Sequence, residues 1–156
     1  MIWLILILNI SSDMEKAPTF ESYDLEGELV ILDSLNKKKL LIIDFWSTIC
    51  EPCVRQLDKA KELIEAYGDS LYYIAINEDP PMFQNRAKNF ARSKDFKFII
   101  ILDEDGSIME NYGVTTLPTT YFLDDSLRIL EIHQGFKVGD EEWFQETIKK
   151  YLGIKE

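Results

Sequence analysis

Two cysteines separated by two residues are the part of this sequence best suited to chemistry. Cys50 and Cys53 lie in the stretch STICEPCVR and are the only cysteines among 156 residues. A pair with this spacing can help to bind a metal ion, close a small disulfide loop or exchange electrons with other thiols. The rest of the sequence must decide among these three chemistries.

A purely structural role for the pair is disfavoured by what else the chain contains. A structural zinc site commonly takes four ligands from cysteine and histidine, but the chain has a single histidine, His133, far from the pair. A chain of this length can bury a core that needs no disulfide framework. We therefore expect no metal and no cofactor, which leaves redox chemistry as the favoured interpretation.

The segments on either side of the pair place it where such chemistry is usually found. Residues 39–46, KLLIIDFW, form the continuous apolar run of a strand buried on both faces of a sheet. Residues 52–67 carry apolar side chains at helical spacing. At the start of that helix, main-chain N–H groups and the helix dipole stabilise a thiolate at Cys50. Cys53 lies one turn further along, where it can attack a mixed disulfide on Cys50.

Strands and helices alternate along the rest of the chain. This order predicts an α/β sandwich, with a mixed central sheet and helices on both faces. The expected elements are a hairpin over 20–34 turning at Glu26-Gly27, a strand over 71–77, a helix near 82–93, a strand over 96–103, a short helix over 108–112, a hairpin over 119–135, and a last helix capped by Asp140.

The N-terminal segment has a composition of its own. Residues 1–10, MIWLILILNI, are almost wholly apolar, so we separate residues 1–16 from a single domain over 17–156. A ten-residue helix would cover about 15 Å, too short for a hydrocarbon core of about 30 Å. The segment suits an export signal or the remnant of an anchor, although a basic start and a cleavage motif are missing. A strand or helix packed on the domain is the alternative.

The charge of the chain limits its partners. A formal net charge of −11 argues against nucleic-acid binding, because phosphate contacts need clustered lysine and arginine. We expect no nucleic-acid partner and a monomeric protein.

Two stretches together carry a resemblance to a known family. IIDFWSTICEPC and, downstream, TTLPTTYFLDD resemble the thioredoxin superfamily. With the early hairpin and DEDGSIMENYGVTTLPTTYFLD, residues 17–152 resemble the extracytoplasmic thiol–disulfide oxidoreductases of the TlpA and ResA type. The resemblance implies a thioredoxin-like α/β/α sandwich with an added N-terminal β-hairpin.

The same resemblance implies an activity, partners and a location. Members of this type mostly reduce disulfides of protein substrates outside the cytoplasm, including apocytochrome c thiols, and are recharged by a membrane dithiol donor. A general thioredoxin-like reductase in the cytoplasm is the alternative. The direction and potential of the redox reaction do not follow from the sequence.

Catalytic roles also follow from the resemblance. Cys50 would be the attacking thiolate and Cys53 the resolving thiol. Asp44 matches the buried acid of thioredoxins, which takes the proton from the resolving cysteine. Burial without a cationic partner should raise the pKa of Asp44, which suits proton transfer near neutral pH.

A second group of residues is expected to surround the substrate. Pro118 matches the cis-proline of the superfamily, beside which the main chain of Thr116 and Leu117 would pair with an extended substrate. The substrate-binding surroundings also include three residues next to the cysteines: Trp46, which should shield them by packing, Glu51, which should modestly oppose thiolate formation, and Pro52, which suits a first helical turn.

The sequence departs from both patterns. Thioredoxins proper have tryptophan before the first cysteine and Gly-Pro within the pair, whereas Ile49 and Glu51-Pro52 stand there. The ResA type often carries a glutamate three residues after the second cysteine, where Gln56 cannot titrate. The site thus combines an acid of the thioredoxin kind with a dipeptide of the ResA kind.

A copper chaperone of the Sco type is the competing function on the same fold. Such proteins use two cysteines and a remote histidine, for which His133 is available. Their cysteines are separated by three residues, however, whereas two residues separate Cys50 and Cys53 here. Titration of the reduced protein with cuprous ion tests this alternative.

Overall fold

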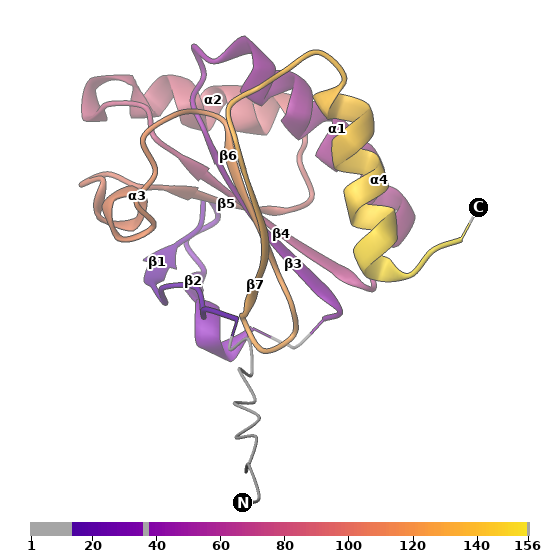
Figure 1. The fold of residues 1–156 in the computed structure, drawn as a ribbon. Helices are drawn as coiled ribbons and strands as arrows, with labels where there is room; N and C mark the ends of the chain where they lie inside the picture. The colour runs from indigo at the N-terminus through magenta and orange to yellow at the C-terminus, as the bar shows by residue number, and fades with distance from the viewer. Residues whose placement is uncertain (1–13, 36–37, 156) are drawn as a thin grey trace, which may run out of the picture.

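The computed structural model of the protein describes residues 14–35 and 38–155. Figure 1 shows the course of the chain. In chain order the elements are β1 (Glu21–Tyr23), β2 (Leu29–Ile31), the 3-10 turn η1 (Leu32–Ser34), β3 (Leu40–Trp46), α1 (Glu51–Tyr67), β4 (Leu71–Asn77), the 3-10 turn η2 (Pro81–Phe83), α2 (Gln84–Lys94), β5 (Ile99–Leu102), α3 (Ser107–Asn111), β6 (Thr119–Leu123), β7 (Ile129–Gln134) and α4 (Asp140–Leu152).

The central sheet is mixed and has β3 in its middle. Its strands lie in the order β5-β4-β3-β6-β7. β3 runs parallel to β4, and β4 parallel to β5, whereas β6 is antiparallel to both β3 and β7. All seven residues of β3 are buried, as its apolar run predicts. The carboxyl ends of β3, β4 and β5 therefore lie at the same end of the sheet, where α1 begins.

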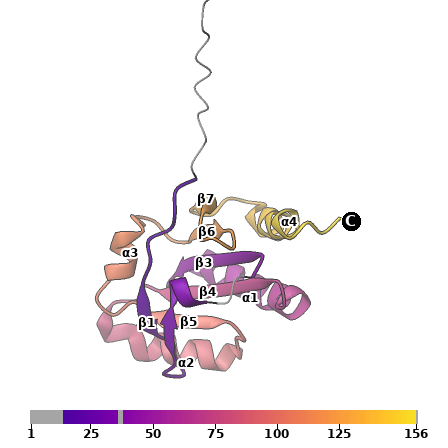
Figure 2. The ribbon, with the colours of Figure 1, turned by 90° about the horizontal axis from the view of Figure 1, so that it is seen from below.

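Side chains of β3 alternate between two cores. Ile42 and Trp46 lie in a cluster with Cys53 and with residues of α1, α2 and α4. Ile43 and Phe45 point to the opposite face, where α3 and the N-terminal hairpin cover the sheet. Figure 2 shows α3 and β1 on one side of the sheet and α1 and α4 on the other. The fold is the thioredoxin-like α/β/α sandwich that the sequence predicts.

The N-terminal hairpin covers one edge of the sheet. β1 and β2 pair antiparallel, and the Asp24 carboxylate accepts the N–H groups of Glu26 and Glu28, each at 2.9 Å, inside the turn. Asp24 also forms a bridge with Ile101 of β5. The hairpin therefore occupies the outer side of an edge strand that would otherwise expose unpaired main-chain groups.

β5 is shorter than the sequence predicts. The strand covers residues 99–102 in place of 96–103. Phe96 and Phe98 precede it, and their rings stack at 4.7 Å between centroids. An apolar run predicts burial but does not distinguish ladder pairing from aromatic packing, so the strand boundary was wrong.

The predicted cap of the last helix is also wrong. Asp140 is the first residue of α4. Its carboxylate accepts the N–H of Lys137 at 2.6 Å and lies 2.8 Å from Nε2 of His133. The side chain therefore stabilises the connection from β7 and does not cap the first turn of the helix.

Most of the predicted N-terminal segment, residues 1–13, lies outside the described residues. The first described contacts begin at Glu15, whose carbonyl accepts the N–H of Ile129 at 2.8 Å. Lys16 forms a bridge with Arg128. These residues therefore lie against the start of β7.

Within residues 14–35 and 38–155, no helix has the length and apolar character needed to span a membrane.

Candidate active site

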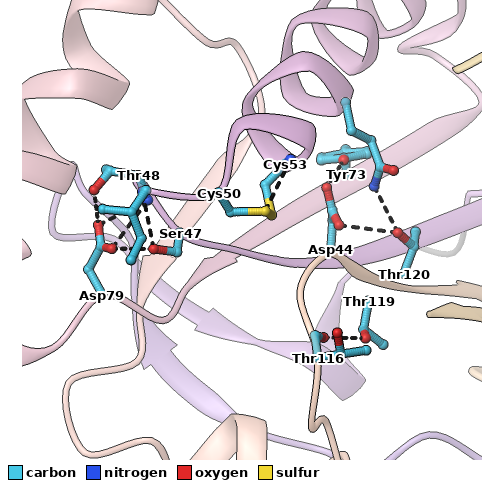
Figure 3. Close-up of a disulfide and its surroundings, with 12 residues drawn as sticks. Asp44, Ser47, Thr48, Cys50, Cys53, Tyr73, Asp79, Thr116, Thr119 and Thr120 are labelled. Carbon is cyan, nitrogen blue, oxygen red and sulfur yellow. Dashed lines mark hydrogen bonds between the residues drawn. A yellow bond between two sulfur atoms is a disulfide. The ribbon is translucent and has the colours of Figure 1, made fainter. Parts of the chain in front are cut away.

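The cysteine pair lies at the carboxyl end of β3, where α1 begins. Cys50 is the residue before the helix, and it forms a disulfide with Cys53. The N–H of Cys53 points at Sγ of Cys50 over 3.3 Å, as a helix N-terminus directs its free amides (Figure 3). Pro52 lies in this first turn, where a missing N–H removes no helical hydrogen bond.

The two sulfurs differ in access. Cys53 is completely buried, whereas Cys50 is partly exposed and follows Ile49, whose side chain is 78% exposed. An incoming substrate sulfur can therefore reach Cys50 more easily than Cys53. This asymmetry is what an attacking and a resolving cysteine require.

Asp44 lies on the same face of β3 as the pair. It alternates in phase with Ile42 and Trp46, which share a cluster with Cys53, and it is completely buried. The hydroxyl of Tyr73 donates to Oδ2 of Asp44 at 2.5 Å, and that of Thr120 donates to Oδ1 at 3.2 Å. Figure 3 shows both donors around the carboxyl group, beside the disulfide.

Gln56 extends this network to α1. Its Nε2 donates to Oγ1 of Thr120 at 2.8 Å, and its side chain is 5% exposed. The amide that stands where related proteins often have a glutamate thus contacts Asp44 through one hydroxyl. Asp44 is held by groups from β4, β6 and, indirectly, α1.

The environment of Asp44 shifts its protonation toward neutral pH. Burial raises the pKa of Asp44 from 3.8 to about 6, although the hydrogen bonds from Tyr73 and Thr120 and the nearby amide of Gln56 act in the opposite direction. Desolvation disfavours the charged form of a buried carboxyl group, which is the cause expected from the sequence. A carboxyl group with this pKa can accept and release a proton near pH 7.

The loop before β6 lies next to the end of β3. Thr119 pairs with Phe45, so Pro118 lies one residue further, near Trp46. The Leu117-Pro118 bond is cis. The carbonyl of Pro118 accepts the N–H of Gly135 at 2.7 Å, and that of Thr116 accepts the hydroxyl of Thr119 at 2.7 Å.

Leu117 is one residue of this loop whose main-chain groups are free. Within the described ranges, neither its N–H nor its carbonyl takes part in a hydrogen bond. Thr116 beside it is exposed, and Pro118 is buried. The main-chain groups of Leu117 are therefore free to form hydrogen bonds, whereas the carbonyl of Thr116 already accepts one from Thr119.

Comparison with known proteins agrees with this arrangement. Residues 13–147 match the family model described as Redoxin. The chain belongs to the Redoxin family. It is 31% identical over 137 residues to the thiol-disulfide oxidoreductase ResA of Bacillus thuringiensis subsp. konkukian, covering 87% of this chain and 76% of the relative.

Two solved structures are also similar to this chain. A protein described as thiol:disulfide interchange protein DsbE from Chlorobium tepidum superposes with a TM-score of 0.80 at 27% identity, covering 90% of this chain and 97% of that one. The pneumococcal exposed lipoprotein thioredoxin Etrx1 from Streptococcus pneumoniae gives 0.70 at 25% identity, with 85% and 99% covered. The chain is a thiol–disulfide oxidoreductase with Cys50 and Cys53 as its cysteine pair.

Two predicted neighbours of the pair differ in their access to substrate. Trp46 is completely buried and packs on Phe90, with ring centroids 5.7 Å apart. Its packing role fits the structure, but a direct substrate contact does not, because its side chain does not reach the surface. Glu51 is exposed and forms an ion pair of 2.7 Å with Arg55, which reduces the effect of its charge on Cys50.

The imidazole of His133 already contacts two other side chains. Its Nε2 lies 2.8 Å from Oδ2 of Asp140, and its ring stacks on Trp143 at 4.1 Å between centroids. No three metal-ligating side chains converge in the part of the chain that the structure describes. The histidine that a copper site would need therefore has a structural role at the end of β7.

Sequence reasoning missed Tyr73 and Thr120. Each lies in a strand that was predicted, but the partner of its hydroxyl depends on how β4 and β6 align with β3. Asp44 is directly opposite both Ala75 and Thr120 in the ladders. The signal available in the sequence was a polar residue at an inward position of a buried strand, which requires a buried partner.

Replacing Tyr73 with phenylalanine should raise the pKa of Asp44 further. The substitution removes a donor that favours the charged carboxylate, and a hydrogen bond to a charged group corresponds to about one pKa unit or more. The titration of the Asp44 carboxyl carbon by NMR measures the change in oxidised protein. The matched control is Tyr121→Phe, which removes a buried hydroxyl bonded to the Tyr112 carbonyl on the other face. An unchanged Asp44 titration in Tyr73→Phe would contradict this role.

Proposed function

We propose that this oxidoreductase reduces disulfides of protein substrates outside the cytoplasm, with Cys50 as the attacking sulfur. The observation that carries the proposal is the unequal access of the two sulfurs, with Cys50 open at the start of α1 and Cys53 buried on the Asp44 side. In the reduced protein the thiolate of Cys50 attacks one sulfur of a substrate disulfide. A mixed disulfide forms, and the other substrate sulfur leaves as a thiolate.

The second half of the reaction uses the buried side of the site. Cys53 transfers its proton to Asp44 and attacks the sulfur of Cys50. The bond between Cys50 and the substrate breaks, the second substrate thiolate leaves, and the protein disulfide forms. Two electrons have then passed to the substrate, whose two thiolates take up protons from Asp44 and from water. A dithiol donor outside this chain must reduce the protein disulfide again.

The reduction potential of the cysteine pair decides whether the protein reduces or oxidises its substrates. A reduction potential near that of thioredoxin, about −270 mV, favours substrate reduction, whereas one near −120 mV favours oxidation. We expect the lower range, together with catalysis of insulin reduction when dithiothreitol supplies electrons. A potential above that of the glutathione pool would assign the protein to disulfide formation instead.

A location outside the cytoplasm is supported by two lines of argument. The apolar residues 1–10 suit an export signal or anchor, and the similar Etrx1 is described as an exposed lipoprotein. Apocytochrome c is the substrate class that this location and the ResA likeness favour. Labelling of the full chain in intact cells with a membrane-impermeant maleimide tests the location, since a cytoplasmic thiol stays unlabelled until the cells are lysed.

A further inference from the structure

Asp79 is a buried carboxylate that the exchange reaction does not use. It lies two residues after the end of β4, before the turn Pro80-Pro81, and its exposed fraction is 2%. Figure 3 shows its carboxylate facing Ser47 and Thr48, on the side of the disulfide away from Asp44. A buried charge is costly unless hydrogen bonds or a counter-charge compensate it.

The compensation comes mainly from the loop that leads into the cysteine pair. Oδ1 accepts the hydroxyl of Ser47 at 2.5 Å, and Oδ2 accepts that of Thr48 at 2.7 Å. The N–H of Thr48 lies 3.2 Å from both oxygens, and Nδ2 of Asn77 lies 3.3 Å from Oδ2. Although burial acts to raise the pKa of Asp79, the bonds from Ser47, Thr48 and Asn77 hold it below its usual value. A guanidinium nitrogen of Arg86 lies 3.8 Å from Oδ1.

These bonds continue to Cys50 through Ser47. Oγ of Ser47 accepts the N–H of Ile49 at 3.3 Å, and its carbonyl accepts the N–H of Cys50 at 3.1 Å. Each residue from Ser47 to Cys50 is thus bonded to Asp79 or to a group that Asp79 holds. The position of Cys50 relative to the free amides of α1 follows from this loop.

We propose that Asp79 is a positioning residue for the reactive sulfur, because it fixes the Ser47–Ile49 loop so that Cys50 meets the N-terminal amides of α1. The inference rests on the proposed function, in which Cys50 is the attacking thiolate. It assigns to Asp79 an effect on thiolate formation and on redox equilibrium, in addition to stability.

The test measures how fast Cys50 of reduced protein is alkylated across pH. In Asp79→Asn we expect the midpoint of this profile to rise by about one pH unit, which slows alkylation below the midpoint about tenfold. Thr48→Val removes one donor without changing charge, and should shift the midpoint in the same direction by a smaller amount. The equilibrium constant with glutathione should move with the midpoint, because a less stable thiolate makes the reduced form less favoured.

The direction in which the alkylation midpoint moves distinguishes a loss of positioning from the removal of a negative charge. Removing a negative charge near Cys50 would by itself favour the thiolate and lower the midpoint. The matched control is Asp124→Asn, because Asp124 likewise accepts N–H groups, those of Ser126 and Arg128, in a turn at the opposite end of the sheet. It should lower the melting temperature and leave the alkylation profile unchanged.

Other results would contradict either the positioning role of Asp79 or the proposed function. A midpoint that falls or stays constant in both Asp79→Asn and Thr48→Val overturns the inference, as does an equal shift in Asp124→Asn. If Asp79→Asn does not fold, Thr48→Val decides alone by the presence or absence of the upward shift. Alkylation of Cys53 before Cys50 in the unmodified protein would overturn the proposed function itself, which distinguishes that failure from the failure of positioning.

Discussion

Replacing Cys50 with serine is expected to abolish disulfide reduction, whereas replacing Cys53 with serine should trap mixed disulfides. The buried Cys53 cannot reach a substrate sulfur when Cys50 is missing. In Cys53→Ser the exposed sulfur still attacks, but no resolving thiol follows. Incubation of each reduced variant with a disulfide-containing protein, followed by mass analysis without reductant, measures the adducts.

The two cysteine variants are matched controls for each other. Both lose the Cys50–Cys53 disulfide and each gains one hydroxyl, so a difference between them reports role and not the loss of the crosslink. We expect adduct in Cys53→Ser only, and no insulin reduction by either variant. Equal amounts of adduct in both would show that the two sulfurs are interchangeable, and the assignment of attacking and resolving roles would be wrong.

The elements that present the cysteine pair were predictable because their signals are local. The apolar run of β3 and the helical spacing of α1 fixed the strand, the helix and the pair between them to within one residue. The role of Asp44 came from the resemblance to thioredoxins, and its position inside a buried strand is consistent with that role, because a buried carboxyl group needs a function or a partner. The fold class then followed from the order of the elements.

The partners of these residues were not predictable, because they depend on contacts between distant parts of the chain. Tyr73 meets Asp44 only when β4 pairs with β3 in one register. Asp79 stands between polar residues and prolines, a pattern typical of an ordinary turn, and only its burial against the Ser47 loop distinguishes it. Asp140 shows the reverse error, since a local capping rule was overridden by contacts with the β7 connection.

Replacing Asp44 with asparagine should both stabilise the oxidised protein and slow its resolution step. The pKa of Asp44 is about 6 when folded, against 3.8 for an unperturbed group. A carboxyl group whose folded pKa is raised binds its proton more tightly in the folded state, so the contribution of Asp44 to stability is fully present below pH 3.8 and is lost as the pH rises through about 6. Asparagine cannot ionise, and the variant should gain up to about 3 kcal/mol above pH 7 and little below pH 4.

Urea unfolding of oxidised protein between pH 4 and pH 8 measures this gain, and Asp79→Asn gives a control of opposite sign. The pKa of Asp79 is lowered, so its charged form contributes stability at neutral pH that the asparagine variant loses. In reduced Asp44→Asn, decay of the mixed disulfide should slow most near and below neutral pH, where little Cys53 thiolate forms without a proton acceptor. Lower stability with normal resolution would make Asp44 a structural residue only. Greater stability of Asp44→Asn together with slow resolution would mean that the buried carboxyl group of Asp44 lowers the stability of the protein and serves as a proton acceptor.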